Sequence, residues 1–482
     1  MKVALFRADG QLLALSIQEL QLLHPAPEQV EIEAEVVWAA VVKGTTQVLA
    51  QAPGGGPAIA GIGMSSQAQT FVLLDGAGEP VRPAVMWIDT RAGKEAEEFR
   101  HKFKPEECLP HIGKPAIDAI ASAPKLRWLA KHDEETLARA RTLLLLPDYV
   151  LYRLTGQRVT DPVTAGSTGF FHPRRHEWWD DAVQFAGAGH LQLPTVKRPG
   201  ELAGHLQAEA AHELGLPGGI LCAVGTNDQL TGALGAGNVQ EGTVSEATGT
   251  ALALVMTAAA GDERERARVP GGPHPAGDHL RYLLAYSKTA GIVLKWFRDR
   301  FWPAKSYDEM FEKISQVPVG SDGVTCLPHF SGTATPHFNP EATGAFAGLR
   351  LSHTPAHLAR AIVESLTFDL LLNLRLLEKS GGPVTTIRAM GGGARSGLWL
   401  QMKADVLGLS VERVACPEAA SLGAAELAMV AAGEFASVAE ASLALYRGDR
   451  TFEPDARRSA EYVEPLRRYE HLYRTLYGEG KA

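Results

Sequence analysis

An aspartate lies between two glycine-rich turns in the middle of the chain. Residues 225–229 read Gly-Thr-Asn-Asp-Gln, residues 248–250 read Thr-Gly-Thr, and the segment between them is so rich in small residues that backbone must pack closely there. A carboxylate beside a Gly-Thr loop suits transfer of a phosphoryl group to an alcohol. The carboxylate accepts the hydroxyl proton, while backbone N–H groups and a threonine hydroxyl hold phosphate oxygens. Asp228 is therefore the candidate general base.

A second glycine-rich turn, residues 391–396 (Gly-Gly-Gly-Ala-Arg-Ser), lies between a predicted strand and a predicted helix. Backbone N–H groups at a helix start favour phosphate, and the missing side chains let a flat base approach the backbone. A plain strand-to-helix connection explains this motif equally well on its own. It is not the dinucleotide-binding fingerprint, because Ser396 stands at the third glycine position. The sequence contains no GxxxxGK[ST] motif, which excludes a P-loop enzyme.

Polar side chains also gather at the ends of predicted strands in the first half of the chain. Gln67 and Gln69 would project to the same side of an extended segment, where their amides could hold the hydroxyls of a small polyol. Trp87 would supply an apolar wall. Asp89 and Arg91 could contribute to the same site, or could equally well satisfy each other as a structural ion pair.

The elements that must position these groups follow from hydrophobic periodicity. The first half predicts a hairpin over residues 3–15, strands over 58–64, 70–74 and 220–224, and mostly helix over 92–155. The second half predicts strands over 244–248, 251–256, 280–287 and 386–390, a loop over 261–278, and helices over 289–301, 357–379 and near the C-terminus. Each half begins with a hairpin and ends in a strand, a glycine loop and a helix. This pattern predicts duplicated α/β domains around a ligand-binding cleft, with the boundary near residues 237–240.

Composition narrows the class of protein. With 482 residues, two domains are expected. The net charge of −8 and scattered Lys and Arg argue against nucleic-acid binding. The four cysteines are far apart, which favours reduced thiols, and no metal-binding spacing occurs. No apolar run is long enough to span a membrane and no signal peptide is recognised, so a cytoplasmic location is expected.

Several motifs, in the same order, resemble the FGGY carbohydrate kinases, the group of xylulokinase, ribulokinase, gluconokinase and glycerol kinase. The most specific is residues 344–349 (Gly-Ala-Phe-Ala-Gly-Leu), followed at the family's spacing by residues 357–364. The other matching segments are residues 84–91, 124–128, 154–156, 335–336, 391–396, 401–405 and 422–425. The similarity covers residues 2–478.

The resemblance implies an α/β fold of two actin-like, ribonuclease-H-like domains around a central cleft. Residues 1–238 would bind the sugar and carry Asp228 as the base, and residues 239–482 would bind ATP and end in a C-terminal helix. The implied substrate contacts are Ala68, Gln69 and Gln229, which join Gln67, Trp87 and Asp89 from the strand ends as candidate substrate-binding residues. The implied nucleotide contacts are Gly249, Thr250, Gly291, Lys295, Gly392 and Gly393. The pair Ala68-Gln69 matches neither the Met-His of xylulokinases nor the Arg-Glu of glycerol kinases, and Asn227 replaces the usual glycine before the base.

The implied activity is ATP-dependent phosphorylation of a sugar or polyol, with a ketopentose such as xylulose as the preferred substrate and Mg²⁺ as the metal. The expected partner is a small molecule, and binding to nucleic acid or to a membrane is not expected. A homodimer is one expected assembly.

One departure from the family concerns the first strand. Family members open with a strand, an Asp and a Gly-Thr loop that forms a first phosphate loop, whereas this sequence begins inside the second strand, at about Lys2. Either the recorded start lies too far downstream or the protein is a non-catalytic relative that binds nucleotide and sugar. A central strand with about four aliphatic side chains contributes ~1.5–3 kcal/mol for each. Because that sum approaches the ~5–15 kcal/mol stability of a domain, we favour the first account. The polypeptide as written is expected to be a poor catalyst.

Overall fold

One seven-stranded mixed sheet forms the centre of the C-terminal half in this computed structural model, which describes residues 1–52, 58–261, 269–302 and 306–478. The strand order is β18-β19-β17-β16-β22-β23-β24. The strands are β16 (Thr243–Thr248), β17 (Leu252–Ala259), β18 (Gly271–His274), β19 (Gly277–Ser287), β22 (Thr386–Met390), β23 (Val411–Val414) and β24 (Gly448–Phe452). Strands β16 and β22 are parallel neighbours, so the loops that follow them emerge at the same edge.

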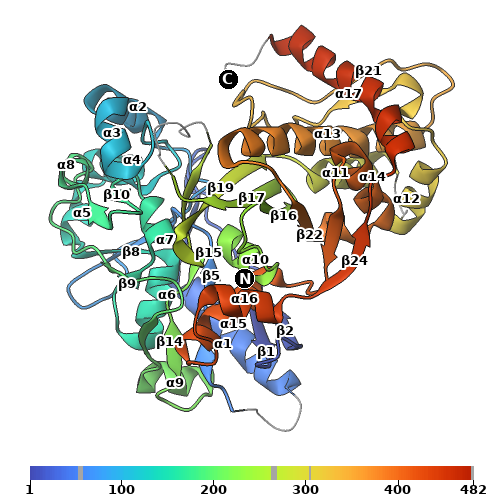
Figure 1. The fold of residues 1–482 in the computed structure, drawn as a ribbon. Helices are drawn as coiled ribbons and strands as arrows, with labels where there is room; N and C mark the ends of the chain where they lie inside the picture. The colour runs from blue at the N-terminus through green and yellow to red at the C-terminus, as the bar shows by residue number, and fades with distance from the viewer. Residues whose placement is uncertain (53–57, 262–268, 303–305, 479–482) are drawn as a thin grey trace.

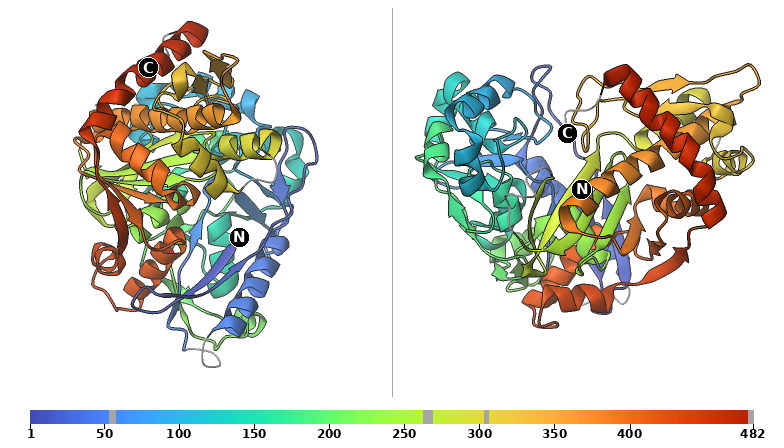
Figure 2. Two further views of the ribbon diagram at one scale, coloured as in Figure 1. Left: turned by 90° about the vertical axis from the view of Figure 1, so that its right-hand side faces the viewer. Right: turned by 45° about the horizontal axis from the view of Figure 1, so that its top comes forward.

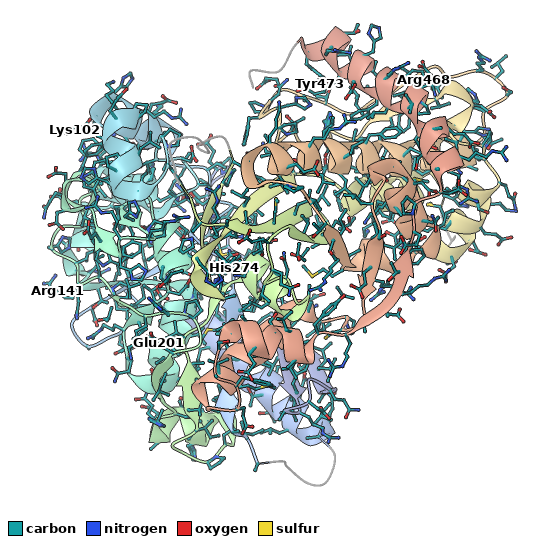
Figure 3. The ribbon with its side chains drawn as sticks, in the orientation of Figure 1. Lys102, Arg141, Glu201, His274, Arg468 and Tyr473 are labelled. Carbon is teal, nitrogen blue, oxygen red and sulfur yellow. The ribbon has the colours of Figure 1, made fainter. Side chains whose placement is uncertain are left out.

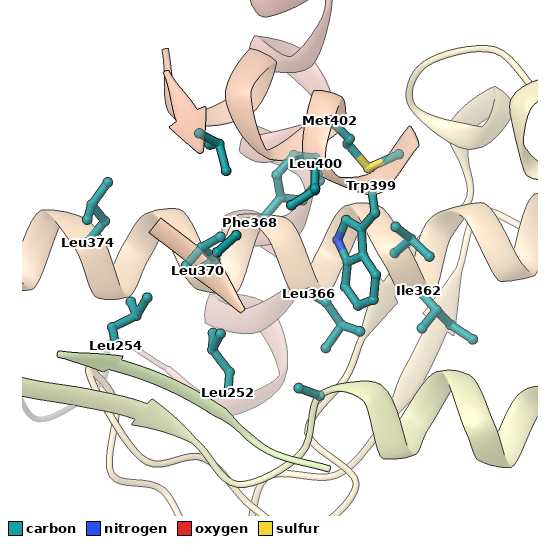
Figure 4. Close-up of a cluster of buried hydrophobic side chains, with 14 of the residues drawn as sticks. Leu252, Leu254, Ile362, Leu366, Phe368, Leu370, Leu374, Trp399, Leu400 and Met402 are labelled. Atoms are coloured by element: carbon teal, nitrogen blue, oxygen red, sulfur yellow. The ribbon is translucent and has the colours of Figure 1, made fainter. Parts of the chain in front are cut away.

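The helices of this half are α11 (Gly291–Phe301), α12 (Tyr307–Ser315), α13 (Pro355–Gly381), α14 (Gly397–Leu407), α15 (Ala419–Ala431), α16 (Val438–Leu445) and α17 (Ala456–Tyr477). Helices α13 and α14 pack on the sheet, whereas α15 packs against the N-terminal half and α16 packs on α15. Along α13, Leu366, Leu370 and Leu374 recur every four residues and belong to one buried cluster with Leu252 and Leu254 of β17 (Figure 4). Helix α17 lies at the outside of this half (Figure 2) and docks through the buried Tyr462, Tyr469 and Tyr473.

The N-terminal half contains several small sheets. Their orders are β1-β2, β3-β7-β6-β8, β13-β14-β4, β15-β5, β12-β9 and β10-β11. The strands of this half are β1 (Lys2–Phe6), β2 (Leu12–Ile17), β3 (Glu31–Ile32), β4 (Gly61–Ile62), β5 (Ser65–Ser66), β6 (Phe71–Leu74), β7 (Ala84–Val85), β8 (Thr142–Leu145), β9 (Val159–Thr160), β10 (Phe171–His172), β11 (Glu177–Trp178), β12 (Thr195–Val196), β13 (Leu202–His205), β14 (Leu221–Ala223) and β15 (Thr226–Asn227). Strands β20 (Thr325–Leu327) and β21 (Ala345–Ala347) form a separate pair in the C-terminal half.

Ten helices of the described chain belong to the N-terminal half and pack on these sheets (Figure 1). They are α1 (Ala34–Gln51), α2 (Gly93–Lys102), α3 (Pro105–Ile112), α4 (Ser122–His132), α5 (Glu134–Arg139), α6 (Leu146–Thr155), α7 (Pro162–Gly166), α8 (Asp180–Phe185), α9 (Ala208–Leu214) and α10 (Asp228–Gly235).

Most predicted elements are confirmed, and two are wrong in extent. Residues 271–274, expected in a loop, form the edge strand β18; residues 262–268 of that loop lie outside the described part of the chain. The strand expected over 58–64 is only the two residues of β4, because a turn leads at once into β5. His274 of β18 is buried near the junction of the two halves (Figure 3), and its Nε2 lies 3.1 Å from the Thr257 hydroxyl.

Helices α10 and α15 cross at the junction, where small residues allow backbone contact. A β-carbon on Gly235 would lie 1.9 Å from the Ala419 carbonyl oxygen, and one on Gly423 would lie 2.0 Å from that of Thr231. The predicted close packing of residues 230–237 is therefore confirmed.

Strand β1 has one open edge. Within the described residues, β1 pairs with β2 and β4 pairs with β14, and no strand joins β1 to β4. Between them lies a cavity of about 910 Å³ lined by mostly apolar side chains of β1, α1, β4 and α15, with Asp228 at its rim.

Candidate active site

Asp228 is the first residue of α10, and Asn227 caps the start of this helix. The side chain of Asn227 accepts a hydrogen bond from the Gln229 backbone N–H at 2.9 Å, so the helix begins at the candidate base. Asp228 is exposed toward the groove, yet desolvation by the surrounding protein raises the pKa of its carboxyl group above the ordinary value, against hydrogen bonds from Gln229 that lower it. A carboxylate with a raised pKa is a better proton acceptor.

Strand pairing brings the Asp228 turn beside the predicted sugar wall. Strands β15 and β5 are parallel, with Thr226 opposite Ser65 and Asn227 opposite Ser66, so Asp228 and Gln67 follow neighbouring strand ends. A 2.5 Å contact between the Ser65 and Thr231 hydroxyls also ties β5 to α10. The structure therefore unites two motifs that are about 160 residues apart in the sequence.

The turn after β5 differs from the extended segment that the sequence predicts. Gln69 has a positive φ of 63°, so the argument that Gln67 and Gln69 project to the same side of an extended chain is wrong. The Gln69 N–H donates to the Ser167 hydroxyl at 3.1 Å, and its carbonyl accepts from the Ser122 hydroxyl at 3.0 Å. Ala68 is buried. The turn is thus held firmly by its backbone.

Two other predicted contacts have side chains at this surface. The Gln67 amide donates to the Thr70 hydroxyl at 2.9 Å, which orients it, and Trp87 is 40% exposed, as an apolar wall requires. Gln229 is half-buried beside Asp228.

Asp89 does not belong to this surface. Its side chain is fully buried, its oxygens accept from the Arg91 guanidinium at 2.7–3.0 Å and from the Val30 N–H at 2.7 Å, and Arg91 also reaches Glu31. No oxygen of Asp89 is left for a hydroxyl group of a ligand. The assignment of Asp89 as a substrate contact is corrected, and the structural ion pair is the right interpretation.

Lys125 supports the turn that carries Trp87, a role that the sequence does not indicate. It is fully buried on α4, and its ammonium group donates to the carbonyl oxygens of Met86, Trp87 and Ile120 at 2.9–3.1 Å. Desolvation lowers its pKa to about 8. It fixes the backbone that carries Trp87. The sequence holds Lys125 in one of the matching segments, but a lysine on a helix gives no sign of burial.

Four of the six residues predicted to contact the nucleotide lie in two adjacent loops, which we call the phosphate loop (residues 248–250) and the adenosine loop (residues 391–393). They follow the parallel strands β16 and β22. Gly249, Thr250, Gly391 and Gly392 are exposed, while Thr248 and Gly393 are buried beneath them. A β-carbon on Gly249 would meet no atom within 4 Å, so open space lies beside its backbone.

Helix α11 begins against the phosphate loop. The N–H groups of Gly291 and Ala290 donate to the carbonyl oxygens of Gly249 and Thr250, both at 2.9 Å. Gly291 therefore contributes through its missing side chain, since a β-carbon there would lie 2.4 Å from the Gly249 oxygen. Lys295, one turn later, is exposed and forms an ion pair with Asp299 at 2.5 Å.

Helix α10 connects the two walls. Leu230 and Ala233 pack against Val255 of β17, and a β-carbon on Gly232 would lie 3.1 Å from the Met390 methyl group at the end of β22. The helix that begins with Asp228 therefore packs against β17, which follows the phosphate loop, and against the end of β22, which precedes the adenosine loop. This arrangement can hold an alcohol near the base and a phosphate ester opposite it.

The described residues contain no group of three or more His, Cys, Asp or Glu side chains that could hold a metal ion. Within the same residues, no helix is both long enough and apolar enough to cross a membrane.

Comparison with known proteins shows close relatives over nearly the whole chain. A xylulose kinase of Staphylococcus epidermidis is 27% identical over 465 residues, covering 96% of this chain and 92% of the relative. A glycerol kinase of Paracidovorax citrulli is 30% identical over 493 residues, covering 97% and 96%. The crystal structure of xylulose kinase from Rhodospirillum rubrum has a TM-score of 0.89 at 27% identity, covering 99% of this chain and 96% of that one.

Residues 1–235 match the N-terminal domain of the FGGY family of carbohydrate kinases, and residues 247–432 match its C-terminal domain. The fold is accordingly the two-domain actin-like fold that the sequence resemblance implies. With both domains and the structure in agreement, the chain belongs to the FGGY family of carbohydrate kinases and is a sugar kinase.

Proposed function

We propose that this sugar kinase transfers the terminal phosphoryl group of ATP to a hydroxyl group of a ketopentose such as xylulose. The observation that carries the proposal is the position of Asp228. It lies beside the Gln67 turn through the β5–β15 pairing, on a helix that packs against β17 after the phosphate loop and against Met390 before the adenosine loop. The xylulose kinases among the relatives support the sugar class.

The residues of this chain have distinct roles in that reaction. Asp228 accepts the proton of the attacking hydroxyl, and Gln229, Gln67 and the Gln69 turn orient the sugar against Trp87. Domain closure would bring the sugar and the nucleotide together and exclude water.

The open backbone of the phosphate and adenosine loops fits a nucleotide, because no side chain fills the space at Gly249 and Gly392 lies at the surface. Gly249 and Thr250 would hold phosphate oxygens, with Gly392 and Gly393 beside the adenosine. Mg²⁺ would supply charge neutralisation, held mainly by phosphate oxygens and water.

A coupled assay of ADP release with a panel of ketoses, polyols and aldonates tests this proposal. We expect the highest kcat/KM with a ketopentose. A preference for glycerol or gluconate would overturn the substrate class and leave the kinase in place.

A further inference from the structure

A buried ion pair lies directly beneath the phosphate loop. The Lys403 ammonium group of α14 is 2.7 Å from a carboxylate oxygen of Glu246 on β16, and the two side chains are only 2% and 0% exposed. Lys403 also donates to the Thr248 hydroxyl at 3.2 Å, and that hydroxyl donates to the other oxygen of Glu246. Lys403 lies 5.0 Å from the ring centre of Trp399, whose position on α14 Figure 4 shows.

The residue that this pair holds, Thr248, separates the two nucleotide loops. A β-carbon on Gly393 would lie 2.6 Å from the Thr248 β-carbon, and one on Gly391 would lie 3.1 Å from the Thr248 carbonyl oxygen. The backbone of the adenosine loop therefore rests on Thr248. A rotation of the Thr248 side chain would change the distance between the loops.

Helix α14 joins the same two loops by a second route. It begins after the adenosine loop, where the Ser396 hydroxyl accepts from the Trp399 N–H at 3.3 Å, and its Lys403 reaches under the phosphate loop. One rigid element thus carries the end of one loop and anchors the other.

The energetics favour a positioning role over a stabilising one. A fully buried ion pair contributes little net stability, because desolvation of both charges offsets their attraction. Its value lies in fixing geometry, since Glu246 and Lys403 together leave the Thr248 hydroxyl one low-energy orientation.

We propose that Lys403 and Glu246 are positioning residues for the nucleotide, which set the spacing of the phosphate and adenosine loops through Thr248. The inference rests on the proposed function, because it takes these two loops as the nucleotide site.

The test compares binding of Mg-ADP by calorimetry in the whole protein and in the variant Lys403→Met/Glu246→Met, which removes both charges together. We expect the variant to fold and its Kd for ADP to rise by about tenfold or more, with the Kd for the sugar unchanged. Thr248→Val keeps the shape of Thr248 and loses its hydrogen bonds, so this variant should also bind ADP more weakly. Thr248→Ser keeps the hydroxyl group and should retain most of the ADP affinity.

A matched control is the buried pair Arg360–Glu364 of α13, with its N–O distance of 2.8 Å, which contacts neither loop. Arg360→Met/Glu364→Gln should change thermal stability and leave the Kd for ADP as in the unaltered protein.

The outcomes separate the two proposals. If the unaltered protein binds no ADP, the nucleotide assignment of the loops fails and the inference falls with it. If the unaltered protein binds ADP and the folded Thr248→Val variant binds it equally well, the positioning role is overturned while the kinase assignment stands.

Discussion

At the scale of single residues, Asp228 combines exposure to the cleft with a raised pKa. Desolvation by the surrounding protein raises the pKa, and it outweighs the backbone N–H groups at the start of α10, which lower it. The same aspartate on an open surface turn would be a weaker base.

Asp228→Asn should lower kcat by at least about a hundredfold, because an amide cannot accept the hydroxyl proton. Binding of ADP should be unchanged, since Asn keeps the size of the side chain. Steady-state kinetics with calorimetry checks both parts. A variant that turns over at a near-normal rate would remove Asp228 from the role of base.

The pH dependence should follow from the direction of the pKa shift. Asp228 must be ionised to act, so kcat should rise with pH through a pKa above the usual aspartate value. Because the folded-state pKa is raised, any stability that the protonated group contributes is present below the unfolded pKa and lost as pH rises through the folded pKa. A kcat–pH profile with its acid limb at or below the usual aspartate pKa would contradict this.

At the scale of elements, the crossing of α10 and α15 depends on glycines that admit no side chain. Gly423→Ala should destabilise the protein by about 1–3 kcal/mol, because its methyl group would lie 2.0 Å from the Thr231 oxygen. Gly93 of α2 offers the matched control, since a β-carbon there would meet nothing within 4 Å. Gly93→Ala should be neutral or stabilising by up to about 1 kcal/mol. Urea unfolding measures both, and equal effects would refute the packing argument.

A strand added by design should pair with the open edge of β1. An extension of about ten residues ahead of Met1, made of a tight turn and an apolar strand, has the length to fold back along β1 into the groove. It should raise Tm by several degrees, as burial of about four aliphatic side chains at ~1.5–3 kcal/mol each is large on the scale of domain stability. A Gly/Ser extension of equal length is the control. If both extensions leave Tm and the binding of a hydrophobic dye unchanged, the groove does not accept a strand.

At the scale of the whole molecule, the candidate base and the sugar wall belong to one half, while both nucleotide loops belong to the other (Figure 1). Reaction therefore needs the halves to approach. The radius of gyration from small-angle scattering should fall when ADP and a ketopentose are both bound, and less with either alone. Asp228→Asn should close in the same way because it keeps both binding surfaces. An unchanged radius with both ligands bound would argue against closure.

The sequence by itself determined the family and the two α/β halves, and it indicated the candidate base and the glycine loops. Each of these depends on local chemistry: a carboxylate in a turn, glycines after strands, apolar residues at helical spacing. Local sequence patterns do not predict the contacts of a residue whose partner is distant in the chain. Gln69 and Asp89 look alike as polar residues after strands, yet the first is held at a positive φ by hydrogen bonds from other segments and the second is enclosed by Arg91 and Val30.

Only the tertiary structure decided which lysines are buried. Lys125 and Lys403 lie on helices like many exposed lysines, and their burial follows from acceptors that the fold brings from other elements. The same holds for the β5–β15 register that places Asp228 beside Gln67, and for the groove beside β1. Burial and desolvation are properties of packing among distant segments, so the sequence determines them but no local pattern in it reveals them.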